Sequence, residues 1–233
     1  MPTDDDLLLI PGLLCTAALY APQVAALSPS MRIAVANHTV AASISDIARV
    51  ILASAPQRFS LCGLSMGGYL AFEIMRQAPE RVIRLALLDT SAKPDTPERT
   101  VARRALVARA EGEGLGAVSQ SLLPQWVHPR RLSDTALGAT VGRMAAETGV
   151  THFARQQAAI AGRIDSRPGL GAINVPTLVL VGREDAATPV ADAEEIARGI
   201  VGARLVVAED CGHLSTLEQP DAVNRALHAW LEA

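Results

Sequence analysis

Six short aliphatic runs, each bounded by turn residues, alternate with longer segments in which apolar residues recur at helical spacing. Runs this short and this uniformly apolar are typical of strands that are buried on both faces of a sheet. Strands that alternate with helices favour parallel pairing, with helices covering both faces. Ligands of open parallel sheets bind at the carboxyl ends of the strands, so we expect functional residues directly after these runs. The runs are Leu7–Ile10, Ile33–Val35, Phe59–Gly63, Leu85–Asp89, Leu178–Gly182 and Leu205–Ala208.

The segments between these runs are predicted to be helices because their apolar residues repeat at i, i+3 and i+4. Ser43 with Asp46 forms an N-terminal capping pattern ahead of the second of them. The predicted helices are Ala17–Leu27, Ile44–Ala55, Met66–Gln77, Val190–Ile200 and Asp221–Glu232.

The alternation stops between about Lys93 and Gly171, where the pattern is helical and is broken at the two prolines of "LPQWVHPRR". We therefore predict an α/β core formed by residues 1–92 and 171–233, with a helical cap inserted at residues 93–170. The insertion holds 11 Lys and Arg against 7 Asp and Glu, or +4, which leaves −7 for the rest of a chain at −3. A basic lid would favour anionic or polar substrates, and the alternative is an Arg-rich helix face in solvent.

Composition limits the class of protein. The 233 residues are 49% hydrophobic and 19% charged, which suits one sizeable globular domain, and 3% aromatic content requires an aliphatic core. A net charge of −3 provides no field for nucleic acid or anionic membrane. The acidic start lacks the basic region of a secretory signal, and no apolar run approaches the ~20 residues of a membrane helix. We expect a cytoplasmic protein with a small-molecule substrate and no nucleic-acid or membrane partner.

Cys15, Cys62 and Cys211 show no metal-ligand spacing and cannot all pair with one another. We expect three reduced thiols of small apolar character, no metal and no cofactor.

The stretch from Gly63 to Gly67 reads Gly-Leu-Ser-Met-Gly, which matches the G-x-S-x-G pattern of a nucleophile elbow. An extended apolar run precedes Ser65 and a helical pattern follows it, which places the serine in a sharp strand-to-helix turn. Small neighbours are needed there because the chain passes close to itself. Ser65 is therefore the predicted nucleophile.

A serine hydroxyl needs a base to take its proton, and His213 is the preferred candidate. It lies in "LVVAEDCGHL", just past the final strand run, on the same strand-end rim as Ser65. His152 is the second candidate because a lid can lie over the site. His38, His128 and His228 are interpreted as surface or packing residues.

Asp185 is the preferred partner for the base, because it follows the strand run in "PTLVLVGRE" and gives the chain order Ser, Asp, His that this elbow type requires. Asp89, at the end of "RLALLD", is the rival. The predicted oxyanion donors are the backbone N–H groups of Met66 and of Leu13, with Leu14 as an alternative to Leu13. Leu14 and Trp126 are predicted to contribute to an apolar substrate pocket.

With these motifs in order, the sequence resembles an α/β-hydrolase. "LLLIPGLLCTAALYAPQVAAL", "LCGLSMGGYLAFEIM", "PTLVLVGREDAATPV" and "AEDCGHLSTLEQPDAVNRAL" are similar to the oxyanion loop, elbow, acid strand and histidine loop of that superfamily. The resemblance is greatest to small cofactor-free esterases and lactonases, such as enol-lactone hydrolases and pimeloyl carrier-protein methyl ester esterases. It implies about six mainly parallel strands, since the usual antiparallel first pair is missing. Pro11-Gly12 stands where many relatives have His-Gly.

The predicted function is therefore hydrolysis of a small carboxylic ester or lactone through an acyl-enzyme on Ser65, with His213 and Asp185. The fold hosts many chemistries, so C–C bond hydrolysis, a lyase reaction and cofactor-free perhydrolysis stay open as alternatives. A ligand receptor that retains the triad is a further alternative, from a different class of protein.

Overall fold

The computed structural model describes residues 6–233 and contains a six-stranded sheet of order β2-β1-β3-β4-β5-β6, in which every neighbouring pair is parallel. Residues 1–5 lie outside the described part, including most of the acidic start on which the cytoplasmic expectation depends. The sheet confirms the predicted number of strands and their direction. The strands are β1 (Asp6–Ile10), β2 (Ile33–Val35), β3 (Phe59–Leu64), β4 (Val82–Leu88), β5 (Thr177–Gly182) and β6 (Arg204–Ala208).

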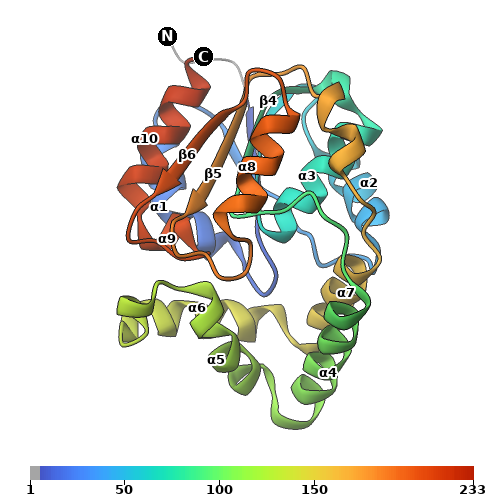
Figure 1. Ribbon diagram of the computed structural model, residues 1–233, viewed down its shortest axis with the longest axis vertical. Coiled ribbons are helices and arrows are strands. Elements are labelled where there is room, and N and C mark those ends of the chain that lie inside the picture. Colours follow the sequence, from blue (N-terminus) through green and yellow to red (C-terminus); the bar gives the residue numbers. More distant parts are fainter. Residues whose placement is uncertain (1–5) are drawn as a thin grey trace.

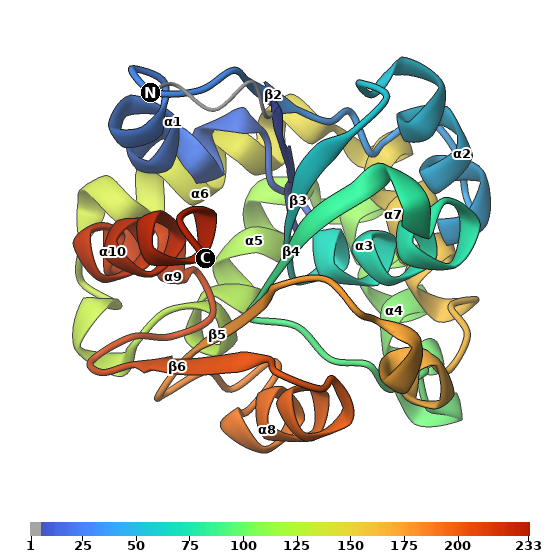
Figure 2. The same cartoon turned by 90° about the horizontal axis from the view of Figure 1, so that it is seen from above.

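Helices cover both faces of this sheet (Figures 1 and 2). In Figure 2, α1 and α10 lie on one side of the strands, and α2, α3 and α8 lie on the other. A group of four helices lies below the sheet in Figure 1. The helices are α1 (Ala21–Leu27), α2 (Ile44–Ser54), α3 (Met66–Gln77), α4 (Pro97–Glu113), α5 (Leu115–Trp126), α6 (Thr135–Thr148), α7 (Val150–Ala161), α8 (Val190–Gly199), α9 (Ser215–Glu218) and α10 (Pro220–Leu231).

Alternate residues of each central strand enter opposite halves of the core. Leu7 and Leu9 of β1 pack with the α1 and α10 side, whereas Leu8 and Ile10 pack with the α2, α3 and α8 side. Because successive strand side chains point to opposite faces, a strand buried on both sides must be apolar throughout. This explains why the runs are uniformly aliphatic rather than alternating.

Two predicted elements differ from the structure, whereas the other predicted strands and helices agree to within one residue at each end. The predicted helix Ala17–Leu27 is a 3₁₀ turn at Ala17–Tyr20 followed by α1, because Pro22 cannot donate to the carbonyl four residues earlier and fits only in a first helical turn. Strand β4 begins at Val82 rather than Leu85 and ends at Leu88, and Asp89 leaves it with φ 45°. The Ser43 cap is confirmed, since its side chain accepts the N–H of Asp46 at 3.1 Å.

The segment between β4 and β5 is helical, as predicted, and holds α4, α5, α6 and α7. Its helix α5 continues through Pro124 and ends at Trp126, so the break falls within "LPQWVHPRR", as predicted, and after the first proline. The two ends of the segment are joined, because Ser166 N–H donates to Ala92 O at 2.9 Å and Arg163 Nε donates to Lys93 O at 3.0 Å. Within residues 6–233, no helix combines the length and the apolar character that a bilayer crossing requires.

Helix α3 begins in close contact with β1, and Gly67 makes that contact possible. A Cβ atom added at Gly67 would lie 1.9 Å from Ile10 O, a backbone atom that cannot rotate away. One added at Gly63 would lie 2.2 Å from Gly67 O. Both glycines therefore allow the strand-to-helix turn to sit against the centre of the sheet.

We expect Gly67→Ala to lower the free energy of unfolding by about 1–3 kcal/mol or more, because the methyl group must displace β1 or α3. Urea denaturation of the purified variant measures this change. The matched control is Gly142→Ala in α6, where an added Cβ meets no atom within 4 Å. That substitution should raise stability by about 0.5–1 kcal/mol, since alanine favours a helix interior. Equal effects of the two substitutions would contradict the packing argument.

Candidate active site

Ser65 occupies the turn between β3 and α3 with φ 56° and ψ −114°, a conformation that costs a non-glycine residue about 1–3 kcal/mol. The turn is held from the neighbouring strand. Ser65 N–H donates to Leu88 O at 3.0 Å, and the Thr90 hydroxyl donates to Ser65 O at 2.8 Å. Ser65 thus lies at the carboxyl end of β3 with its side chain partly exposed.

The His213 ring lies between Ser65 and Asp185. Its Nε2 atom is 2.9 Å from Ser65 Oγ, and its Nδ1 atom is 2.8 Å from Asp185 Oδ2. With the proton on Nδ1, the ring donates to the carboxylate and accepts from the serine hydroxyl. The three residues come from loops after β3, β5 and β6, so the predicted convergence at the carboxyl edge of the sheet is present in the geometry.

Asp185 is held by its own turn. Its Oδ1 atom accepts the N–H groups of Ala187 and Thr188 at 2.8 and 2.9 Å, and its Oδ2 atom accepts the Thr188 hydroxyl at 2.8 Å. Thr188 Oγ1 also lies 3.3 Å from His213 Nδ1. Sequence reasoning missed Thr188, although an aspartate followed by a threonine three residues later is a local signal for such a turn.

The electrostatic environment alters the proton affinity of His213. Burial of the ring lowers its pKa, but the charge of Asp185 and its hydrogen bond, with the charge of Asp89, raise it by more. The pKa of His213 therefore lies above its ordinary value of 6.5.

Asp89, the rival acid, is fully buried and is engaged elsewhere. Its carboxylate accepts the Gly182 N–H at 3.0 Å and the Ser215 hydroxyl. Burial, together with the charge of Asp185, raises the pKa of Asp89 well above the usual range. Among the described residues, His213 forms its carboxylate hydrogen bond with Asp185 and not with Asp89.

The loop after β1 supplies the predicted oxyanion donors. Within residues 6–233, the backbone N–H groups of Leu13 and Met66 donate to no protein acceptor. The alternative donor, Leu14, has φ 57° and donates its N–H to Gln156 Oε1 at 3.2 Å. Gln156 comes from α7 of the insertion and also places Nε2 2.8 Å from His38 Nε2, which is 2.9 Å from Gly12 O.

The other predicted residues divide between the pocket and the core. A cavity of about 210 Å³ opens beside Ser65 and His213, and Leu13 and Trp126 line it. Leu14 is outside the lining and only 1% exposed, and His152 is engaged with Thr148 O at 2.8 Å rather than with the site. His38 is buried, and burial lowers its pKa to about 4.

The described residues contain no group of three or more His, Cys, Asp or Glu side chains arranged to hold a metal ion. Cys15, Cys62 and Cys211 are free and buried, and burial raises the pKa of Cys15 and of Cys62 to about 12.

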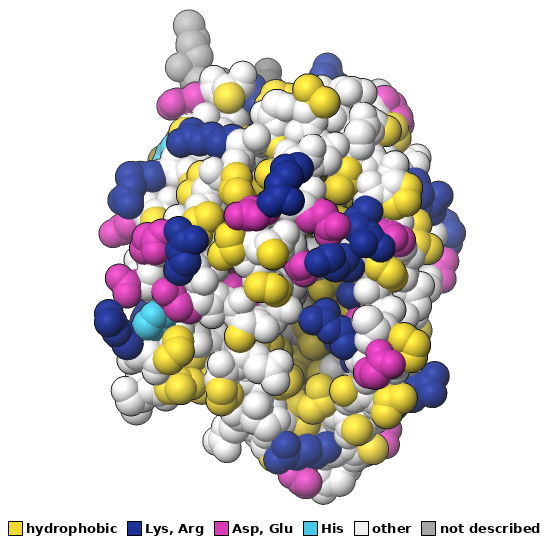
Figure 3. Space-filling model, in the orientation of Figure 1, with side chains coloured by type: hydrophobic (Ala, Val, Ile, Leu, Met, Phe, Trp, Pro, Cys, Tyr) yellow, Lys and Arg dark blue, Asp and Glu magenta, His cyan; other side chains and the backbone are white. Residues whose placement is uncertain are grey.

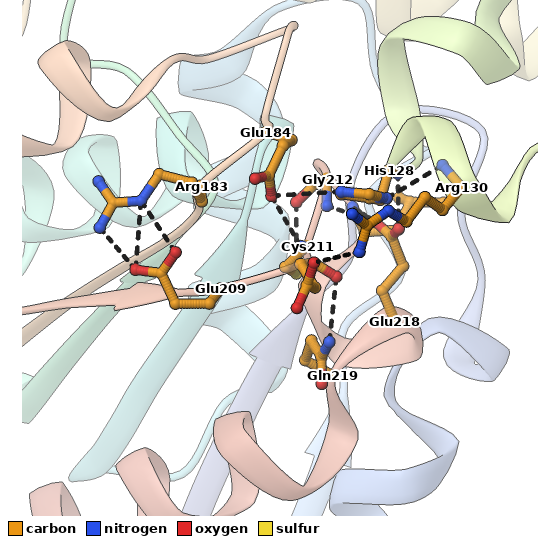
Figure 4. Close-up of polar contacts among 11 residues, drawn as sticks. His128, Arg130, Arg183, Glu184, Glu209, Cys211, Gly212, Glu218 and Gln219 are labelled. Carbon is orange, nitrogen blue, oxygen red and sulfur yellow. Dashed lines mark hydrogen bonds and ion pairs between the residues drawn. The ribbon is translucent and has the colours of Figure 1, made fainter.

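A buried carboxylate joins the histidine loop to the insertion (Figure 4). Glu218 accepts the His128 N–H at 2.7 Å on one oxygen and the N–H groups of Gly212 and Leu214 at 3.0 and 3.3 Å on the other. In return, Trp126 O accepts the N–H groups of His213 and Leu214 at 2.9 and 3.1 Å. Glu218 therefore fixes the loop that carries His213 against the segment that carries Trp126.

Comparison with known proteins identifies a family and several relatives. A family model described as the alpha/beta hydrolase family matches residues 7–226. The 3-oxoadipate enol-lactonase 2 of Acinetobacter baylyi is 32% identical over 171 residues, which cover 73% of this chain and 62% of that enzyme's length. A pimeloyl-[acyl-carrier protein] methyl ester esterase of Neisseria meningitidis serogroup B is 30% identical over 193 residues, 78% of this chain and 71% of the esterase.

Solved structures confirm the fold class. A thermophilic esterase from Thermogutta terrifontis, described as malate bound, superposes with a TM-score of 0.90 at 30% identity and covers 100% of this chain and 91% of its own. The enol-lactonase from Burkholderia xenovorans LB400 gives a TM-score of 0.88 at 28% identity, and the match covers 99% of this chain and 92% of the enol-lactonase chain.

We expect Glu218→Gln to lower the free energy of unfolding by about 1–3 kcal/mol. The glutamine NH₂ group would replace one carboxylate oxygen, and an NH₂ group cannot accept a hydrogen bond from the buried backbone N–H group that it faces. The control is Glu209→Gln, which removes an exposed ion pair with Arg183 and should change stability by less than about 1 kcal/mol. Urea denaturation compares the two variants. A Glu218→Gln variant as stable as Glu209→Gln would contradict the role assigned to Glu218.

Proposed function

Because this chain belongs to the α/β-hydrolase family, we propose that it is a serine hydrolase that cleaves a small carboxylic ester or lactone. The observation that carries the proposal is the distance of 2.9 Å between Ser65 Oγ and His213 Nε2, with Asp185 2.8 Å from the far side of the ring. Relatives named for ester and lactone hydrolysis favour this chemistry over C–C hydrolysis, a lyase reaction, perhydrolysis or ligand reception.

In the proposed reaction, His213 Nε2 takes the Ser65 proton as Oγ attacks the substrate carbonyl carbon. The resulting oxyanion accepts the N–H groups of Leu13 and Met66, and each positioned donor of this kind typically lowers the barrier by about 3–4 kcal/mol. His213 then gives its proton to the leaving alkoxide, which leaves an acyl group on Ser65. Water, deprotonated by the same imidazole, attacks the acyl-enzyme and releases the acid.

In this proposal the α/β core and the helical insertion have separate roles. Residues 1–92 and 171–233 form the catalytic core, and residues 93–170 form a cap that closes the pocket. The cap supplies Trp126 to the lining and Gln156 to the loop that carries Leu13. The apolar part of the lining, which includes Leu13 and Trp126, suits a small acyl group better than a peptide. A lactone would differ only in that its alkoxide stays attached to the acyl-enzyme.

We expect Ser65→Ala to lower the turnover of p-nitrophenyl acetate by roughly 10⁴-fold or more, because the nucleophile is lost while the oxyanion donors remain. A fluorophosphonate probe should label the wild type and not this variant. Ser121→Ala in α5, at a residue that does not line the cavity, is the control and should keep both properties. Undiminished turnover by a folded Ser65→Ala variant would refute the proposed function.

The pH dependence of kcat/KM follows from the His213 environment. The base must be neutral, so kcat/KM should rise with pH through a pKa above 6.5. Asp185→Asn removes the charge that raises this pKa, so the rising limb should move to lower pH, and kcat should fall by roughly 10⁴-fold. Asp89→Asn, which leaves the Asp185 hydrogen bond in place, should lower kcat much less. If the rising limb of the kcat/KM profile stays at the same pH in Asp185→Asn, the assignment of Asp185 as the carboxylate partner of His213 is contradicted.

A further inference from the structure

The wall of the cavity formed by α4 carries a positive charge that no residue in the described part of the chain neutralises. Arg99 lines the cavity, and its guanidinium forms no hydrogen bond or ion pair with any residue in the range 6–233. Its backbone N–H donates to the Thr96 side chain, which caps α4, at 3.2 Å. Among the described lining residues there is no Asp or Glu.

The other arginine that lines the cavity, Arg103, is paired, whereas Arg99 is not paired with any described residue. Arg103, one helical turn further along α4, contacts the buried Asp95 at 2.7 Å and donates to Gln157 Oε1 at 2.8 Å. Arg163 contacts the same aspartate at 2.8 Å. Within residues 6–233, Asp95 is therefore shared by the guanidinium groups of Arg103 and Arg163 and forms no ion pair with Arg99.

Gln157 provides a second hydrogen-bond donor in the cavity lining. It lines the cavity and is 2% exposed, its Oε1 atom is used by Arg103, and its buried Nε2 atom has no acceptor within the described residues. An unpaired buried donor is costly, so the Gln157 amide would gain from an acceptor on a molecule bound in the cavity. Figure 3 shows Lys and Arg side chains beside the hollow between the core and the helices below it.

We propose that the substrate carries a carboxylate at the end remote from the bond that is cleaved, and that Arg99 binds this carboxylate with Gln157 as a neutral donor. The rest of the lining supports this division, because Leu64, Leu106 and Leu122 provide an apolar passage between the charged wall and Ser65. The substrate class is then a half-ester, or a lactone, of a dicarboxylic acid. This inference rests on the proposed function and specifies its substrate.

The test compares two esters that differ at the remote end, where monomethyl glutarate carries a carboxylate and dimethyl glutarate carries a second, neutral methyl ester. At neutral pH the wild type should show a higher kcat/KM for the monoester, and the ratio of the two values should fall about tenfold in Arg99→Gln, as expected for loss of one charge-assisted hydrogen bond. Arg99→Lys should restore part of the ratio because it keeps the charge. Added salt should lower the wild-type ratio, since the side chain is exposed.

The matched control is Arg104→Gln, which removes an exposed arginine of the same helix that does not line the cavity beside Ser65. Its ratio should equal that of the wild type. The inference is overturned if both esters are cleaved and the ratio is the same in Arg99→Gln as in the wild type, or if Arg104→Gln lowers the ratio equally. Failure of the wild type to cleave either ester would refute the proposed function itself, so the two failures are distinguishable.

Discussion

The backbone of Ser65 is the constraint on which the rest of the site depends. A φ of 56° at a serine is unfavourable, and it persists here because β4, the Thr90 hydroxyl and two close glycine contacts hold the turn from all sides. The strain has a geometric consequence. It directs Oγ out of the sheet toward His213, and among the described residues it leaves the Met66 N–H at the start of α3 without an acceptor.

The helical insertion does more than cover this turn. Its Gln156 fixes the Leu14 N–H, which leaves Leu13 as the open donor of the loop after β1. Its Trp126–His128 segment accepts from the His213 loop and donates to Glu218. Both His213 and the loop that carries Leu13 are therefore positioned partly by residues between β4 and β5. A change in the packing of the insertion would alter the geometry of the site as well as access to it.

Much of the fold was predictable because its causes are local. Strands buried on both faces must be uniformly apolar, so β1 and β3 are visible as aliphatic runs, and Ser43 caps α2 through a neighbour three residues away. The meeting of Ser65, Asp185 and His213 was predictable for a related reason, since parallel strands bring their carboxyl ends to one edge. Even the interruption of the first helix has a local cause in Pro22.

The contacts that sequence reasoning missed join residues far apart in the chain. Gln156 is 142 residues from Leu14, and Glu218 is 90 residues from His128. No periodicity or motif in the sequence indicates such pairs, because they depend on how the insertion packs onto the core. The same holds for Asp89 and Asp185, which both follow strand runs. Only the three-dimensional structure distinguishes the two: Asp185 contacts His213, whereas Asp89 accepts hydrogen bonds from the Gly182 N–H and the Ser215 hydroxyl.

The central claim is that the Ser65 hydroxyl forms a covalent bond with the acyl group of the substrate. Mass spectrometry of acid-quenched protein during turnover of p-nitrophenyl acetate measures this directly. The account predicts an acetyl adduct that maps to the peptide containing Ser65 and that disappears as substrate is exhausted. An adduct on another residue, or rapid turnover with no adduct at any time point in the presence of excess substrate, would contradict it.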